Sequence, residues 1–160
     1  MTRARSLIVA YVTLIGVAAS LLLAACGDAA PGSEREADIY AAVIRALVPP
    51  DDDATMVTRE VFIGSGDEGV PLDLQADVLQ ELNEYEGLRF VDDRAEAVED
   101  APPRLVHNQG VYLEIGPIPE RGTRLEVDAL RYLDEEHQQR LRLDVTRTAG
   151  AWTVGDVSEI

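Results

Sequence analysis

An uncharged run of 19 residues, 7–25, is the feature that most limits what this chain can become. Arg3 and Arg5 are the only charged residues before it. A positive start followed by an apolar stretch and small residues is typical of a secretory signal peptide, which is removed on export. A run of about 18 or more apolar residues is also long enough to cross a bilayer as a helix. In both cases the two arginines keep the N-terminus in the cytoplasm, so we expect the rest of the chain to lie outside.

The run ends in a more specific motif, Leu23-Ala24-Ala25-Cys26, which contains the only cysteine of the chain. This motif resembles the lipobox of bacterial lipoproteins, and residues 1–26 as a whole are similar to a lipoprotein signal peptide. The resemblance implies that Cys26 carries a diacylglyceryl group on its thiol and that the chain is cut just before it. Two acyl chains anchor a protein stably, whereas one binds a membrane only marginally. We therefore expect a lipid anchor at Cys26, on the outer face of the cell membrane, with an uncleaved transmembrane helix as the alternative.

The charge of the chain argues against nucleic acid as a partner. It has 14 arginines, no lysine and 30 acidic residues, which gives a formal net charge of −16. Without residues 1–25 there are 12 arginines against 30 acids, or −18. Such a surface repels phosphate backbones and anionic lipid headgroups, so we expect membrane contact through the lipid alone. The lack of lysine also excludes Schiff-base chemistry and the lysine of a P-loop.

The residues after the signal peptide divide into a tether and one domain. Residues 26–33 are small and turn-forming, which predicts a flexible, lipidated tether. Residues 34–160 are enough for a single globular domain, since a chain of this size buries about two thirds of its unfolded surface without disulfides.

Two helices are expected in the first half of this domain. Ser33 and Glu36 fit a capping box ahead of apolar residues at helical spacing, and a pair of prolines ends the pattern. A second helix is expected over 72–85, where apolar residues share one stripe, with Gly87 as its C-terminal cap.

The second half of the domain is dominated by strand patterns. Leu125, Val127 and Ala129 alternate with charged residues, which is the period-two signal of a half-buried sheet. Helices followed by neighbouring strands favour an α+β fold, with two helices packed on a curved antiparallel sheet. The segment 150–154 is similar to the last hairpin of cystatin-like and nuclear-transport-factor-2-like domains, which implies the curvature and transfers no function. We expect Trp152 in the core. The predicted strands are 56–63, 88–91, 111–115, 124–132, 140–146 and 151–154.

The sequence GSGDEG at 64–69 is a literal G-x-G-x-x-G between a predicted strand and a predicted helix, with Asp92 after the next strand. In dinucleotide-binding proteins such a loop holds a pyrophosphate on bare backbone N–H groups at a helix N-terminus. Here Asp67 and Glu68 would repel the phosphates, and Pro71 would break the required helix. We therefore expect an acidic loop and no nucleotide cofactor.

Catalytic patterns are incomplete. His107 and His137 are the only histidines, and we expect both on the surface. Ser65 and Ser158 are the only serines after the tether, and neither lies in a complete G-x-S-x-G motif. The sequence therefore assigns no catalytic residue.

Metal-binding patterns are also incomplete. The two histidines do not have the spacing of zinc ligands. The acidic clusters at 51–53 and 92–93 do not follow a calcium-binding loop, and charge runs of this kind usually face water. No metal ligand is assigned.

These patterns favour a non-enzymatic binding or accessory module of the cell envelope, with another envelope protein as its partner. The alternative is a small-molecule-binding or enzymatic domain with a pocket between the helices and the sheet. A structural spacer is a third hypothesis. The sequence leaves enzymatic activity open.

Overall fold

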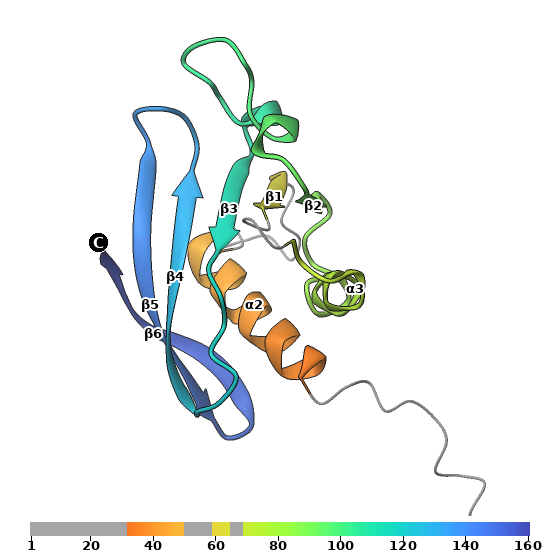
Figure 1. The fold of residues 1–160 in the computed structure, drawn as a ribbon, viewed down its shortest axis with the longest axis vertical. Helices are drawn as coiled ribbons and strands as arrows, with labels where there is room; N and C mark the ends of the chain where they lie inside the picture. The colour runs from red at the N-terminus through yellow and green to blue at the C-terminus, as the bar shows by residue number, and fades with distance from the viewer. Residues whose placement is uncertain (1–31, 50–58, 65–68) are drawn as a thin grey trace, which may run out of the picture. The chain divides into compact units, whose positions relative to one another are not determined.

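The computed structural model describes residues 32–49, 59–64 and 69–160, and Gly32–Ile160 form one compact unit (Figure 1). The predicted lipid site Cys26, the acidic cluster at 51–53 and Ser65 lie outside the described residues. Among the helices that are described, none has the length and apolar character needed to cross a bilayer.

Two α-helices, α2 (Ser33–Leu47) and α3 (Leu72–Glu81), pack against each other. The predicted capping box is wrong, because the helix begins one residue earlier than it requires: the N–H of Glu36 donates to the carbonyl of Gly32 at 3.0 Å. Ser33 is therefore the first residue of α2, and Gly32 takes the cap position. The helix ends before the two prolines, as expected.

The second helix is shorter than the predicted span 72–85. Its C-terminal cap is Leu82, so the prediction of Gly87 as the cap is wrong. Gly87 has a different role: its carbonyl accepts the N–H of Val61 at 3.1 Å, and a Cβ atom there would lie only 3.0 Å from the Cα of Glu60. The lack of a side chain lets this segment pass close to the first strand.

Within the described residues, six strands form one sheet in the order β2-β1-β3-β4-β5-β6. β1 is parallel to both β2 and β3, while β3 to β6 pair antiparallel in chain order. The α+β class is confirmed, but the prediction of an antiparallel sheet is wrong for β1 and β2. The helix α3 connects these two strands as a crossover, which is the connection that parallel pairing needs. The bounds are β1 (Val61–Gly64), β2 (Leu88–Val91), β3 (Val111–Ile115), β4 (Arg124–Tyr132), β5 (Gln138–Thr148) and β6 (Ala151–Glu159).

Both turns that the sequence predicted join antiparallel strands. Residues 119–122 lie in the connection between β3 and β4. Between β5 and β6, Ala149 and Gly150 have φ angles of 53° and 93°, the paired positive values of a type I′ turn. β6 continues to Glu159, beyond its predicted end, with a register shift against β5 along the way.

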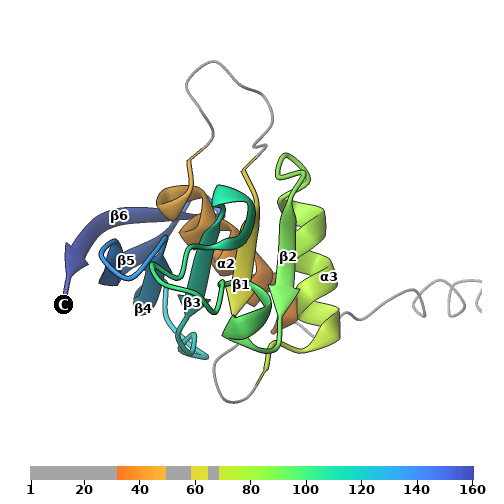
Figure 2. The ribbon, with the colours of Figure 1, turned by 90° about the horizontal axis from the view of Figure 1, so that it is seen from above.

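Both helices lie on one side of the sheet, which we call the inner face (Figure 2). The space between them and the strands is a continuous apolar core that includes Ile44, Val78, Leu113 and Leu143. Trp152 belongs to this core, as the sequence predicted. In the described part of the chain, the side chains that the helices and the sheet bury against each other are apolar.

The opposite side of the sheet, the outer face, has two parts. Beside β1 and β3, the segment 92–110 contributes to a second apolar cluster made of Phe62, Val91, Ala97, Val98, Val106, Tyr112 and Tyr132. Farther along β4 and β5 the outer face is polar. Arg142 pairs with Asp128 at 2.7 Å, and Arg124 pairs with Asp144 at 2.8 Å. These pairs are exposed to water, so they contribute little to the stability of the sheet.

Candidate functional site

A pocket of 520 Å³ lies on the outer face, where β4 turns into β5. This volume falls within the range of small-molecule sites, about 300–1,000 Å³. One wall comes from the segment after β2, and the other from the β4–β5 hairpin. The pocket, called the Arg94 pocket below, is lined by Arg94, Ala95, Val98, Glu99, Asp100, Arg104, Tyr132, Glu135 and Gln138.

Backbone hydrogen bonds hold the first wall in place. A short 3₁₀ helix, η1 (Arg94–Glu96), begins at Asp93, whose carboxylate accepts the N–H of Ala95 at 2.9 Å. Val98 and Val106 then form an isolated bridge, which folds residues 98–106 back on themselves. The N–H of Val106 donates to the carbonyl of Leu133 at 3.0 Å, so this segment is tied to the end of β4.

The floor of the pocket is the buried ring of Tyr132. The Cζ atom of Arg94 lies 3.9 Å from the centre of this ring and 5.6 Å from the centre of Tyr112. Both distances are within the range of cation–π attraction, about 6 Å, and each such contact stabilises by about 0.5–2 kcal/mol. Burial raises the pKa of Tyr112, and the nearby carboxylate of Glu114 raises it further. The tyrosine therefore stays neutral beside the guanidinium.

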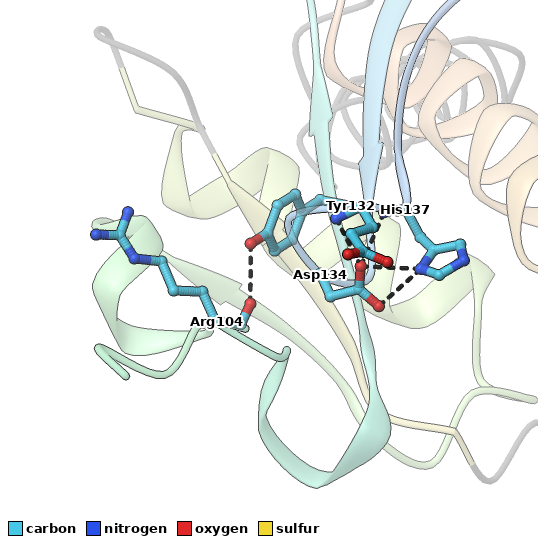
Figure 3. Close-up of polar contacts among 5 residues, drawn as sticks. Arg104, Tyr132, Asp134 and His137 are labelled. Carbon is cyan, nitrogen blue, oxygen red and sulfur yellow. Dashed lines mark hydrogen bonds and ion pairs between the residues drawn. The ribbon is translucent and has the colours of Figure 1, made fainter. Parts of the chain in front are cut away.

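Tyr132 also fixes the first wall, which is formed by the segment after β2. Its hydroxyl donates to the backbone carbonyl of Arg104 at 2.9 Å (Figure 3). Arg104 has a φ of 52°, an uncommon value for a residue with a side chain, and this hydrogen bond anchors the backbone at that point. The ring of Tyr132 and its hydroxyl thus position both arginines of the pocket.

Charged side chains form the rim. The Nε of Arg104 lies 3.4 Å from a carboxylate oxygen of Glu135, and both side chains are about half exposed. Glu99, Asp100 and Gln138 are exposed as well. An exposed ion pair of this length contributes little to stability.

Arg94 differs from Arg104 because it makes no ion pair with any described residue. A second hollow of 340 Å³ lies on its other side and includes Glu114, Asp128 and Arg140. Of these, Asp128 is already paired with Arg142. The contacts of the Arg94 guanidinium within the described residues are those with the rings of Tyr112 and Tyr132.

His137 lies in the same hairpin and has a structural role. Its Nδ1 is 2.9 Å from both carboxylate oxygens of Asp134 (Figure 3). The backbone N–H groups of Glu136 and His137 also donate to Asp134 at 2.8 Å. Partial burial would raise the pKa of Asp134, but these hydrogen bonds outweigh it and lower the pKa. The arrangement stabilises the turn, and the exposed side chain of His137 agrees with the predicted surface position.

The other sequence-predicted candidates do not come together in the described residues. Ser158 pairs with Arg142 across β5 and β6 and makes no hydrogen bond to a histidine. His107 lies half buried in a second 3₁₀ helix, η2 (His107–Gln109). Within residues 32–49, 59–64 and 69–160, no three His, Cys, Asp or Glu side chains are grouped to hold a metal ion.

The flanks of the glycine-rich loop also differ from a dinucleotide-binding fingerprint. β1, α3 and β2 do form a parallel crossover unit, and Asp92 follows β2. However, α3 begins only at Leu72, after Pro71. The third glycine of a fingerprint permits close packing of helix on strand. Gly69 has no atom within 4 Å of the place where its Cβ would be.

Sequence reasoning did not single out the residues of the Arg94 pocket. One signal was available: in β4 the alternation places Tyr132 on the same side as Glu126 and Asp128, so an aromatic ring occupies the polar side of a strand. Comparison with protein-family models, with curated proteins and with solved structures gave no match.

Proposed function

We propose that this chain is a lipid-anchored binding module of the bacterial cell envelope, which takes a small polar ligand in the Arg94 pocket. The observation that carries the binding role is the guanidinium of Arg94, stacked 3.9 Å from the Tyr132 ring and without an ionic partner among the described residues. A rigidly placed charge in a pocket of 520 Å³ is the kind of polar group that orients a ligand.

The anchoring role rests on the lipobox resemblance and on charge. A chain that carries −18 after residue 25 is repelled by anionic headgroups, so it needs a hydrophobic attachment to remain at a membrane. Two acyl chains on Cys26 would supply that attachment. Residues 27–33 would then hold the domain a short distance from the bilayer.

Substitution of the cysteine tests the anchor. We expect wild-type protein in the membrane fraction, cleaved before Cys26 and heavier by the mass of its acyl chains. The variant Cys26→Ser should lack that added mass and leave the membrane fraction or keep its full signal peptide. A matched control is Cys26→Ser with Ser158→Cys, which restores a thiol outside the lipobox and should remain unacylated. Wild-type protein that is unacylated and still membrane-bound at uncleaved mass would show a transmembrane helix instead.

A protein partner is the second candidate, and the edge of the sheet favours it. Among the strands that the structure describes, β6 pairs only with β5, and the residues from Gly155 to Glu159 are all exposed. Such an edge offers free N–H and C=O groups to an incoming strand. A photocrosslinking residue at Val157, which is 47% exposed, should capture one defined envelope protein in intact cells. Equal capture from a control position in the β3–β4 turn, Arg121, would contradict docking at this edge.

A further inference from the structure

On the basis of the proposed binding role, we infer that the Arg94 pocket binds a ligand with a carboxylate and one or two ammonium groups, the chemistry of basic amino acids and short basic peptides. Three features carry this inference: one guanidinium and two carboxylates that make no ion pair among the described residues, and the net charge around them.

Arg94 supplies the carboxylate site. Its guanidinium faces the ring of Tyr132 at 3.9 Å, and a guanidinium is planar, with its N–H donors directed outward in its own plane. No described residue forms an ion pair with Arg94, so these donors are available to a ligand. A carboxylate matches the geometry of two parallel N–H donors, so it is the ligand group that fits this edge.

Glu99 and Asp100 supply the ammonium site. The pocket contains three acidic residues, and the third, Glu135, is already paired with Arg104. Glu99 and Asp100 make no ion pair within the described part of the chain. Both line the pocket and carry like charges, so an ammonium group bound beside them is attracted to both.

The charge balance selects among ligands. Once Arg104 and Glu135 are counted as a pair, the pocket retains one positive and two negative side chains. A neutral amino acid matches the positive charge and one negative charge, whereas a basic amino acid matches all three. The strongly acidic domain also attracts cations and repels anions at long range. We therefore expect affinity to fall from lysine to neutral amino acids to dicarboxylates.

The test is titration calorimetry of the full acylated chain in neutral detergent micelles at low salt. The probes are L-lysine, the dipeptide Lys-Lys, lysine amide, diacetyl-lysine and glutarate. Lysine amide lacks the carboxylate, diacetyl-lysine lacks both ammonium groups, and glutarate is a dicarboxylate. Loss of one charge-assisted contact should weaken binding by about tenfold to a hundredfold. Tighter binding of Lys-Lys than of lysine would assign the site to peptides, and the reverse order to free amino acids.

Variants identify which residue meets which group. Arg94→Gln should weaken the binding of lysine at least about tenfold and leave the affinity for lysine amide unchanged, because only lysine has the carboxylate. The double variant Glu99→Gln, Asp100→Asn should weaken the binding of both lysine and lysine amide. Outside the pocket, Arg121→Gln is the charge-matched control for Arg94→Gln, and Glu120→Gln with Asp156→Asn is the control for the double variant. If Arg94→Gln changes the circular dichroism spectrum, Arg94→Lys replaces it in this experiment. Lysine keeps the positive charge but lacks the planar pair of N–H donors.

The outcomes separate the two proposals. If Arg94→Gln weakens the binding of lysine and of lysine amide equally, the assignment of Arg94 to the ligand carboxylate is overturned. If diacetyl-lysine or glutarate binds as tightly as lysine, the ligand class is wrong and the binding role of the pocket stands. If the wild-type chain binds none of the five probes, both this inference and the binding role of the pocket are overturned, while the lipid anchor is tested separately through Cys26.

Discussion

Replacement of Tyr85 by phenylalanine should have opposite effects on stability at neutral and at high pH. The hydroxyl of Tyr85 donates to the backbone carbonyl of Val48 at 2.6 Å, and the residue is 5% exposed. Tyr85→Phe keeps the ring in the core but leaves this carbonyl without its donor. Because the hydrogen bond is buried, we expect the free energy of unfolding at neutral pH to fall by about 1–2 kcal/mol.

The effect at high pH follows from the proton on this hydroxyl. Burial raises the pKa of Tyr85 to about 12, from an ordinary value of 10.0. Between these two values the unfolded chain releases the proton and the folded chain retains it, so wild-type stability falls as pH rises. The fall is about 1.4 kcal/mol per pH unit, or about 3 kcal/mol in total. The phenylalanine variant has no proton to lose, so it should be the more stable protein near pH 12.

Urea unfolding of residues 32–160, followed by circular dichroism at a series of pH values, measures both effects. Burial also raises the pKa values of Tyr40 and Tyr112, but both tyrosines remain in the variant, so their contributions cancel in the difference. If the wild-type chain remains more stable than the variant by the same free energy of unfolding from neutral pH to about pH 12, the hydroxyl of Tyr85 is not buried as described. Tyr132→Phe, which removes a hydroxyl bonded to Arg104, is the control.

Three further substitutions test the packing of the domain, each by urea unfolding of the same fragment. Leu143→Ala removes a fully buried side chain and should lower the free energy of unfolding by about 2–5 kcal/mol. Its control is Leu72→Ala, at a side chain 82% exposed, which should change that free energy by less than about 0.5 kcal/mol. Gly110→Ala should lower the free energy of unfolding by about 1–3 kcal/mol, because the new Cβ would lie 2.7 Å from a backbone oxygen beside β1. Gly155→Ala should lower it much less, because the nearest atom to its new Cβ is 3.8 Å away. Ala149→Asn should stabilise the β5–β6 hairpin by up to about 1 kcal/mol, because asparagine tolerates the positive φ of 53° better than alanine; a loss of stability would contradict the type I′ assignment.

The strands β2, β3 and β4 were predicted residue for residue, because local signals define them. Alternation of apolar and charged side chains sets the span of β4, and loops with glycine or proline bound β2 and β3. The direction of the strands was not predictable in the same way. Parallel pairing of β1 depends on where α3 returns the chain, which is a long-range property of the fold.

The candidate site was harder to predict for a related reason. Arg94 and Arg104 lie in a segment without regular periodicity, and Tyr132 is 28 residues beyond Arg104 in the chain. Only folding brings them together, so no spacing in the sequence could indicate the pocket. The GSGDEG segment shows the opposite case, a complete local motif whose flanks do not provide the helix start that its chemistry requires.

The separation of the two apolar clusters has a consequence for motion. Residues 92–110 rest on the small outer cluster, and the helices rest on the larger inner core. A segment with few apolar contacts can open by itself, at a free energy well below that of global unfolding. Amide hydrogens of this segment should therefore exchange with solvent faster than those of β4 and β5. A ligand in the Arg94 pocket would slow exchange there and leave the inner core unchanged, so that exchange rates report occupancy residue by residue.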